Sequence, residues 1–375
     1  MWGDLRQAAR RWRYQPGPGG RDLRLDLLRG LCLLKMVFDH LWRTPLHHYR
    51  YWIGFVSAAE GFFLISGGVL GIVYRRRLET LSLAQAARAL WRRAGKLYAA
   101  NLVLVLILAL LETRGLLPTR GFARSWGEEG FRWWRLLHFN QPYFLFVLPR
   151  YVVYLLAAPA ALWLLARRRT HWLLLVSAAL WYLNWEHMGR LLVPVVEPGL
   201  YPFRILSWQL LFFAGMAMGW HRQHLTRLFR ALPWKGLLAV SAFGAAGFAA
   251  LRLAIDGGWL SMGRGPLFHY LGREQLAPLR LLNLGLVALL AFLLVDRLWR
   301  PLVRTAGRLL IPFGQSSLYV FLLHIVLFYG GLALGLHRLP LFAGSPWRLL
   351  LLDLGVIALL GWMVKRRVLF GLVPR

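Results

Sequence analysis

Cysteine is nearly absent from this sequence, and neither a secretory leader nor an internal repeat is visible in it; each of these features narrows the possible functions. The single cysteine, Cys32, excludes a disulfide framework and a cysteine-based metal site, and no residue pattern requires a metal. Residues 1–24 contain arginines and a PGPGG turn but no apolar core of a signal peptide, so we expect the first helix to insert directly. No inverted repeat of the kind found in many transporters is visible.

Hydrophobic residues dominate the composition. Of the 375 residues, 58% are hydrophobic and 14% aromatic, and the mean hydropathy is +0.50, values that exclude an ordinary soluble protein. Apolar runs of about 20 residues, the length that crosses a bilayer, recur along the chain. We therefore predict an all-α polytopic membrane protein with one transmembrane domain (25–367), a basic N-terminal segment (1–24) and a short tail (368–375). The ten predicted spans are 25–42, 51–74, 97–113, 146–166, 171–188, 204–220, 236–255, 279–296, 312–334 and 349–365.

The basic residues follow the topology of the predicted spans. A formal net charge of +31 is also found in proteins that bind nucleic acid. Here, with the N-terminus inside, the inner segments hold about twice as many Lys and Arg residues as the outer ones. This positive-inside pattern argues against nucleic acid as a partner. It predicts that both termini are cytoplasmic and that the protein lies in the inner membrane.

The stretch of residues 24–40, RLDLLRGLCLLKMVFDH, which makes up most of the first predicted span, carries six ionisable residues. On a helix, Arg29 and His40 share one stripe about 16 Å apart, and Asp26 lies one turn from Arg29 on the same side. Lys35 and Asp39 form an i,i+4 pair on the opposite side. Because charges within a membrane are costly, we expect this helix inside the bundle at a functional site, with Arg29 toward the cytoplasm and His40 in the outer half.

The second predicted span supplies a carboxylate. Glu60 is predicted to lie in mid-membrane, and a buried carboxylate needs a cation, so Arg29, Lys35 or His40 is its expected partner. Glycines at helical spacing in the same span predict close packing against a neighbouring helix. These glycines are Gly61, Gly67, Gly68 and Gly71.

Two other segments carry polar side chains in helical patterns. In the ninth predicted span, Ser317 and His324 are seven residues apart on one face. His324 is either part of the chemistry or merely bonded to Ser317 or a neighbouring helix. The inner connection 74–96 alternates leucine and arginine with a helical period, which is typical of a helix lying along the cytoplasmic headgroups.

Six segments in order support a family resemblance. They are RLDLLRG, Asp39-His40, SAAEGFFLISG, QPYFLFVLPRYVVYLL, YPFRILSWQLLFFAGMAMG and GQSSLYVFLLH. The chain, over about residues 21–335, resembles the OpgC family of membrane succinyltransferases, part of the wider type 3 acyltransferase superfamily. It departs from the family pattern at Ser207 and at two positions expected to be apolar, Lys35 and Arg150, and these changes are expected to adjust the acyl or acceptor site.

The resemblance implies transfer of an acyl group, with succinyl favoured, from a cytoplasmic acyl-CoA to a hydroxyl of a periplasmic glucan. The superfamily's Arg-x10-His motif corresponds to Arg29 and His40. We therefore expect His40 to act as general base on the sugar hydroxyl, with Asp39 or Glu60 orienting the imidazole. An acyl-histidine intermediate is the alternative course.

Further residues are assigned to binding. The expected substrate-binding residues are Asp26, Lys35, Ser66, Arg150, Trp208, Gln209, Ser317 and His324. The CoA phosphates are expected at the basic inner mouth, whose candidates are Arg75, Arg76, Arg77, Arg92 and Arg93.

Two other functions compete with glucan succinylation. One is acetyl transfer to lipopolysaccharide, peptidoglycan or another surface polysaccharide. The other is a transporter or flippase with no acyl-transfer activity, which a charged cavity and ten helices would also suit. The expected partners are the bilayer, acyl-CoA and a glycan, and nothing in the sequence sets an oligomeric state.

Overall fold

The computed structural model describes residues 13–14, 21–41, 54–117, 145–186, 204–260, 266–342 and 345–371, and every regular element within these ranges is a helix. The all-α prediction is therefore confirmed for the described chain. The long helices are α2 (Leu23–His40), α3 (Ala58–Arg77), α4 (Leu83–Thr113), α7 (Val147–Ala166), α8 (Thr170–Glu186), α9 (Ile205–Trp220), α11 (Trp234–Asp256), α13 (Pro278–Arg297), α16 (Ser317–Ala333) and α17 (Pro346–Arg366). The short elements are α10 (Arg222–Ala231), α12 (Pro266–Leu271), α14 (Trp299–Leu302), η2 (Val303–Gly307), α15 (Arg308–Gln315) and η3 (Leu336–Arg338).

Each of the ten predicted spans coincides with a helix or a helix pair, and several of these helices can cross a membrane. Six described helices are long and apolar enough to do so, namely α3, α4, α7, α11, α13 and α17, and a bent pair ending in α16 raises the number to seven. The helix α2 carries too many charges for this criterion, while α8 and α9 have only 17 and 16 residues. The chain is thus a membrane protein, and the ten-span topology with cytoplasmic termini stays a prediction.

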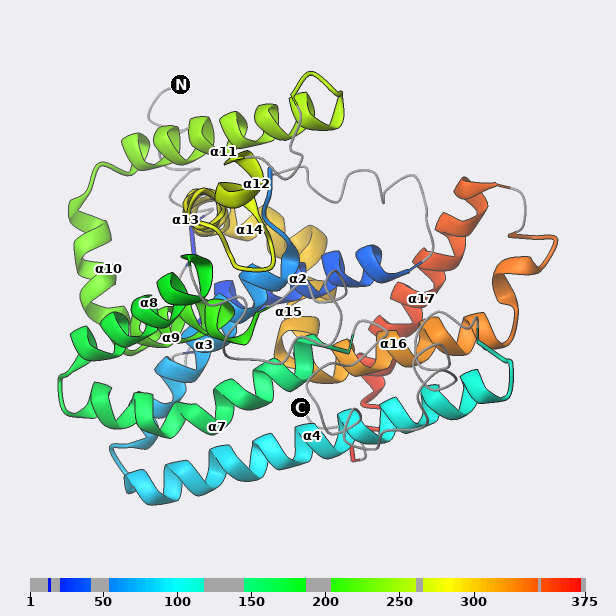
Figure 1. The fold of residues 1–375 in the computed structure, drawn as a ribbon, viewed down its shortest axis with the longest axis horizontal. Helices are drawn as coiled ribbons and strands as arrows, with labels where there is room; N and C mark the ends of the chain where they lie inside the picture. The colour runs from blue at the N-terminus through cyan, green and yellow to red at the C-terminus, as the bar shows by residue number, and fades with distance from the viewer. Residues whose placement is uncertain are drawn as a thin grey trace.

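The helices α2 and α15 lie at the centre of the molecule (Figure 1). On one side of them are α3, α8 and α9, and on the other are α16 and α17. The paired helices α4 and α7 run along one edge, and α11 runs along the opposite edge. This arrangement places the charged first helix inside the bundle, as its two polar faces predict.

The helix α4 corrects one expectation. Residues 83–96 do not form a separate helix on the headgroups but are the first half of a continuous helix of 31 residues, about 46 Å long. Ala86, Leu90 and Ala94 are fully buried and face protein. The cause is local, because these alanine and leucine side chains continue the apolar stripe of the following span, and no proline interrupts the helix at the junction. Ser82 caps the start of the helix by accepting a hydrogen bond from the Gln85 N–H at 3.3 Å.

The predicted span 312–334 is not one straight helix. It breaks at Ser316, where the segment Trp299–Gln315 meets α16 at an angle of 95°. The polar GQSS sequence lies at this break, and α15 packs tightly across α2 just before it. A Cβ atom on Gly314 would lie 1.8 Å from the carbonyl oxygen of Asp26, and one on Gly30 would lie 1.9 Å from that of Leu310. Two glycines therefore hold α15 against α2 and fix the direction in which α16 leaves.

The predicted glycine packing of the second span is confirmed. The helices α3 and α9 touch backbone to backbone: a Cβ atom on Gly67 would lie 2.0 Å from the Phe212 carbonyl oxygen, and one on Gly71 would lie 2.1 Å from that of Met216. The opposing helix contributes Gly215, which meets α3 in the same way. This contact joins α3 and α9 into one rigid layer.

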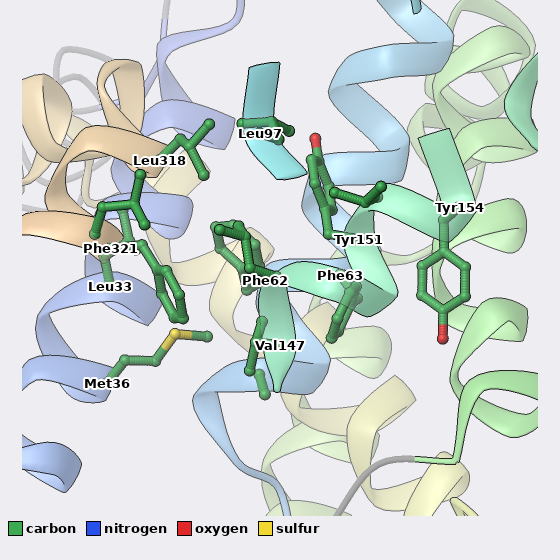
Figure 2. Close-up of a cluster of buried hydrophobic side chains, with 14 of the residues drawn as sticks. Leu33, Met36, Phe62, Phe63, Leu97, Val147, Tyr151, Tyr154, Leu318 and Phe321 are labelled. Carbon is green, nitrogen blue, oxygen red and sulfur yellow. The ribbon is translucent and has the colours of Figure 1, made fainter. Parts of the chain in front are cut away.

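A large hydrophobic core connects α2 and α16 to this layer (Figure 2). Its labelled members come from α2 (Leu33, Met36), α3 (Phe62, Phe63), α4 (Leu97), α7 (Val147, Tyr151, Tyr154) and α16 (Leu318, Phe321). Because all five helices share buried side chains, α2 and α16 have fixed positions relative to α3, α4 and α7.

Candidate functional site

The polar faces of α2 and α16 meet at two points. Near the start of both helices, Arg29 donates a hydrogen bond from Nη2 to the Ser317 hydroxyl. Further along both helices, His40 Nδ1 lies 2.8 Å from His324 Nε2, and the two rings stack at 5.1 Å with an interplanar angle of 20°. Arg29, Ser317 and His324 are buried, while His40 is half-buried. The two stripes predicted from sequence thus face each other.

Arg29 is the cationic end of this site. Its Nε is buried and, within the described residues, has no hydrogen-bond partner. The charges of Arg93 in α4 and of Asp26 act on it. Arg93 also has a buried Nε without a partner among the described residues. Two guanidinium groups that each keep an unused buried donor and whose charges act on one another are suited to an anionic ligand.

The remaining basic candidates of the inner mouth differ from Arg93. The side chains of Arg75, Arg76, Arg77 and Arg92 are exposed. Arg75 donates to the backbone carbonyl of Trp220, which ties α3 to the end of α9. Among the five predicted CoA-binding arginines, Arg93 stands apart because its charge acts on Arg29 and its Nε is buried.

The carboxylate of Asp26 does not pair with Arg29. It accepts hydrogen bonds from Arg21 at 2.6 and 2.9 Å and from Gln315 at 3.4 Å. Arg21 precedes the helix and folds back over its first turn, so the ion pair closes the start of α2. Arg29 instead donates to Ser317.

The predicted i,i+4 pair between Lys35 and Asp39 is confirmed. Both side chains are partly exposed, at 35% and 23%. The Asp39 carboxylate is therefore engaged by a cation of its own helix. The imidazole found against His40 is His324, a pairing that the sequence did not predict.

The partner expected for Glu60 was wrong. Glu60 forms a buried ion pair with Arg280 of α13, and its carboxylate also accepts from the backbone N–H of Ser57 at 2.6 Å and from the Ser57 hydroxyl. The bond from the Ser57 N–H to Glu60 is half of a capping box, whose other half joins the Ser57 side chain to the Glu60 backbone, and Glu60 lies in the first turn of α3.

Arg280 and its neighbour Asn283 were missed. Both are buried in α13, and the Asn283 side-chain oxygen accepts the Phe55 N–H at 2.9 Å. The signal was present in the sequence PLRLLNLGL, where an arginine and an asparagine lie three residues apart within an apolar span.

The other predicted binding residues have several different environments. Trp208 is fully buried and donates to the carbonyl oxygens of residues 273 and 274 at 3.3 and 3.1 Å. Gln209 bonds Ser177 of α8, and Arg150 donates to the Phe146 carbonyl at 2.6 Å. Ser66 is buried in α3, and its hydroxyl has no hydrogen-bond partner among the described residues. In this structure Trp208 and Gln209 join α9 to its neighbours.

The arrangement can support proton transfer at His40 and anion binding at Arg29. An imidazole that is half-buried can take a proton from a hydroxyl, and a second imidazole directly behind it can share the resulting charge. The guanidinium group of Arg29 lies further toward the start of α2, at Ser317. No cluster of three or more metal-ligating side chains occurs among the residues that the structure describes.

The comparisons with known proteins point to one family. No curated protein matches the chain. The family described as OpgC protein matches residues 21–367, which include all the helices named above. Since that match covers nearly the whole sequence, the chain belongs to the OpgC protein family.

Proposed function

We propose that this protein is a membrane O-acyltransferase that moves an acyl group from a cytoplasmic acyl-CoA to a hydroxyl of a periplasmic glucan. The contact between His40 and His324 carries the proposal, because it supplies a paired base at the crossing of two core helices. Family membership supports the same reaction class. Succinyl is the favoured acyl group, from the resemblance of the motifs to membrane succinyltransferases.

The reaction is a single acyl transfer. His40 accepts the proton of the sugar hydroxyl as its oxygen attacks the thioester carbonyl carbon. The carbon–sulfur bond then breaks, and the departing CoA thiolate takes the proton from His40. The products are an ester on the sugar and free CoA, so atoms and charge balance without any further reactant.

The donor enters from the side of Arg29. The predicted topology places the start of α2 at the cytoplasmic side, where Arg29 and Arg93 offer unused donors to the CoA phosphates. The opposite end of α2 carries His40 toward the periplasm. A thioester drawn along this helix would meet the acceptor hydroxyl at the imidazole pair.

A reaction in detergent tests the proposal. Purified protein receives labelled succinyl-CoA or acetyl-CoA with and without a glucan mixture, and both free CoA thiol and label on the sugar are measured. We expect glucan-dependent thiol release that is faster with succinyl-CoA and is lost in His40→Ala. The matched control is His171→Ala, an exposed histidine of α8, which keeps wild-type activity. Absence of glucan-dependent release with either donor would overturn the proposal.

A further inference from the structure

A chain of hydrogen bonds runs through the two imidazoles. His324 Nδ1 lies 3.2 Å from the carbonyl oxygen of Val320, one turn earlier in α16. Its other nitrogen, Nε2, lies 2.8 Å from His40 Nδ1. We propose, on the basis of the acyl-transfer function above, that His324 is a positioning residue that fixes the tautomer of His40 and makes Nε2 of His40 the proton-accepting nitrogen.

The direction of the chain follows from the backbone. A carbonyl oxygen can only accept, so the nitrogen that faces Val320 must carry the hydrogen. His324 is almost fully buried, and in its neutral form it has only one N–H. Its Nε2 therefore presents a lone pair to His40. The hydrogen between the rings must come from His40 Nδ1, which leaves the lone pair of the neutral His40 ring on Nε2.

The opposite assignment would place two lone pairs against each other. If His324 donated from Nε2, its Nδ1 would present a lone pair to the Val320 carbonyl at 3.2 Å, where only a donor is favourable. The orientation of the chain is thus set by the main chain of α16. The Val320 carbonyl oxygen sets this orientation whether or not a substrate is bound.

The same chain assists the reaction. When His40 takes the sugar proton on Nε2, its ring becomes cationic, and the hydrogen bond from Nδ1 to His324 becomes charge-assisted and stronger. His324 therefore stabilises the protonated base without touching the substrate. The interplanar angle of 20° between the two rings suits this bond, because the N–H and the lone pair of an imidazole both lie in the ring plane.

If His324 served only in packing, a side chain of similar size and shape could replace it. His324 also contacts the ring of Phe321 edge to face at 5.4 Å, so a phenylalanine in its place would preserve size and aromatic contact. The phenylalanine would, however, remove the nitrogen that accepts the hydrogen bond from His40 Nδ1. A glutamine would restore an acceptor oxygen near the position of Nε2. The two substitutions therefore separate hydrogen bonding from packing.

Nitrogen NMR of protein labelled with ¹⁵N-histidine tests the tautomer without any reaction. The His40 signals are assigned by comparing wild type with His40→Gln. We expect His40 Nδ1 to carry the hydrogen in wild type, and the two tautomers to mix in His324→Phe. A wild-type His40 that carries its hydrogen on Nε2 would overturn the proposal, whether or not the protein transfers acyl groups.

Steady-state kinetics supply the second readout. Because a wrongly held catalytic imidazole loses most of its effect, His324→Phe should lower kcat by about 100-fold or more, while KM for acyl-CoA stays within about threefold. His324→Gln should recover kcat to within about tenfold of wild type, and the exposed control His171→Gln should leave it unchanged. Equal activity of His324→Phe and wild type, or equal loss in the Phe and Gln variants, would contradict the positioning role. An inactive wild type would instead remove the proposed function and leave the NMR result to decide the tautomer.

Discussion

Glu60 in the first turn of α3 and Arg280 in the first turn of α13 form an ion pair that is almost completely shielded from solvent, with exposed fractions of 0% and 4%. The residues are 220 positions apart in the sequence. The pair joins the start of α3 to the start of α13. It is the most deeply buried charged contact among the described ion pairs.

Removing one member of this pair should destabilise the protein strongly. Arg280→Met leaves a buried carboxylate uncompensated, which costs about 3–5 kcal/mol, and the double variant Glu60→Leu with Arg280→Met should recover much of that loss. The free energy of unfolding in detergent measures the effect. As a control, Arg204→Met breaks a partly exposed pair with Glu274 at 3.8 Å and should cost less than about 1 kcal/mol. Equal costs for Arg280→Met and Arg204→Met would refute the role given to burial.

The close approach of α15 to α2 leads to a second prediction. In Gly314→Ala the new methyl group would overlap the Asp26 carbonyl oxygen, so α15 must move away from α2 and carry α16 with it. We expect a loss of stability of about 1–3 kcal/mol or more, together with loss of acyl transfer. Gly330→Ala in α16 meets open space and serves as the matched control, which should behave as wild type. The same loss in both variants would show that the contact of Gly314 with α2 does not set the effect.

Binding of CoA is the third prediction. CoA without an acyl group is titrated into purified protein, so that the readout does not depend on catalysis. Since charge-assisted hydrogen bonds contribute about 1.5–3 kcal/mol, Arg93→Ala should weaken binding about tenfold to hundredfold. Lys96→Ala removes an exposed charge from the same helix and should change the Kd little. Unaltered binding in Arg93→Ala would exclude this arginine from the donor site.

The carboxylate next to His40 yields a fourth prediction. Asp39 is held by Lys35 at a partly exposed position, and such pairs contribute up to about 1 kcal/mol. Asp39→Asn should therefore lower kcat by less than about fivefold. A loss of a hundredfold would show that Asp39, as the sequence also suggested, orients His40 directly.

Local periodicity accounts for what could be predicted from the sequence. Arg29 and His40 fall on one stripe because an α-helix turns 100° per residue, and the structure directs both at α16. Lys35 and Asp39 pair because residues four apart on a helix are neighbours. The positions of the long helices could be predicted from the apolar runs, because each run lies within one continuous segment of the sequence.

Contacts between distant segments could not be predicted in this way. The pairing of Glu60 with Arg280 depends on which helices pack together, and no spacing in one chain segment reports that. The bend at Ser316 depends on the contact of Gly30 and Gly314 across α2 and α15, and the hydropathy of residues 312–334 is that of a straight span. His324 could be identified as the partner of His40 only from the structure, in which α16 lies beside α2 after this bend.

Acyl transfer across a sealed membrane tests the central claim most directly. Protein is reconstituted into liposomes with a glucan mixture trapped inside, labelled succinyl-CoA is added outside, and label on the trapped sugar is measured for wild type, His171→Ala and His40→Ala. The account predicts label on the trapped glucan with wild type and the His171 variant, and none with the His40 variant. Label that is equal in His40→Ala, or transfer that occurs with none of the three proteins, would contradict it.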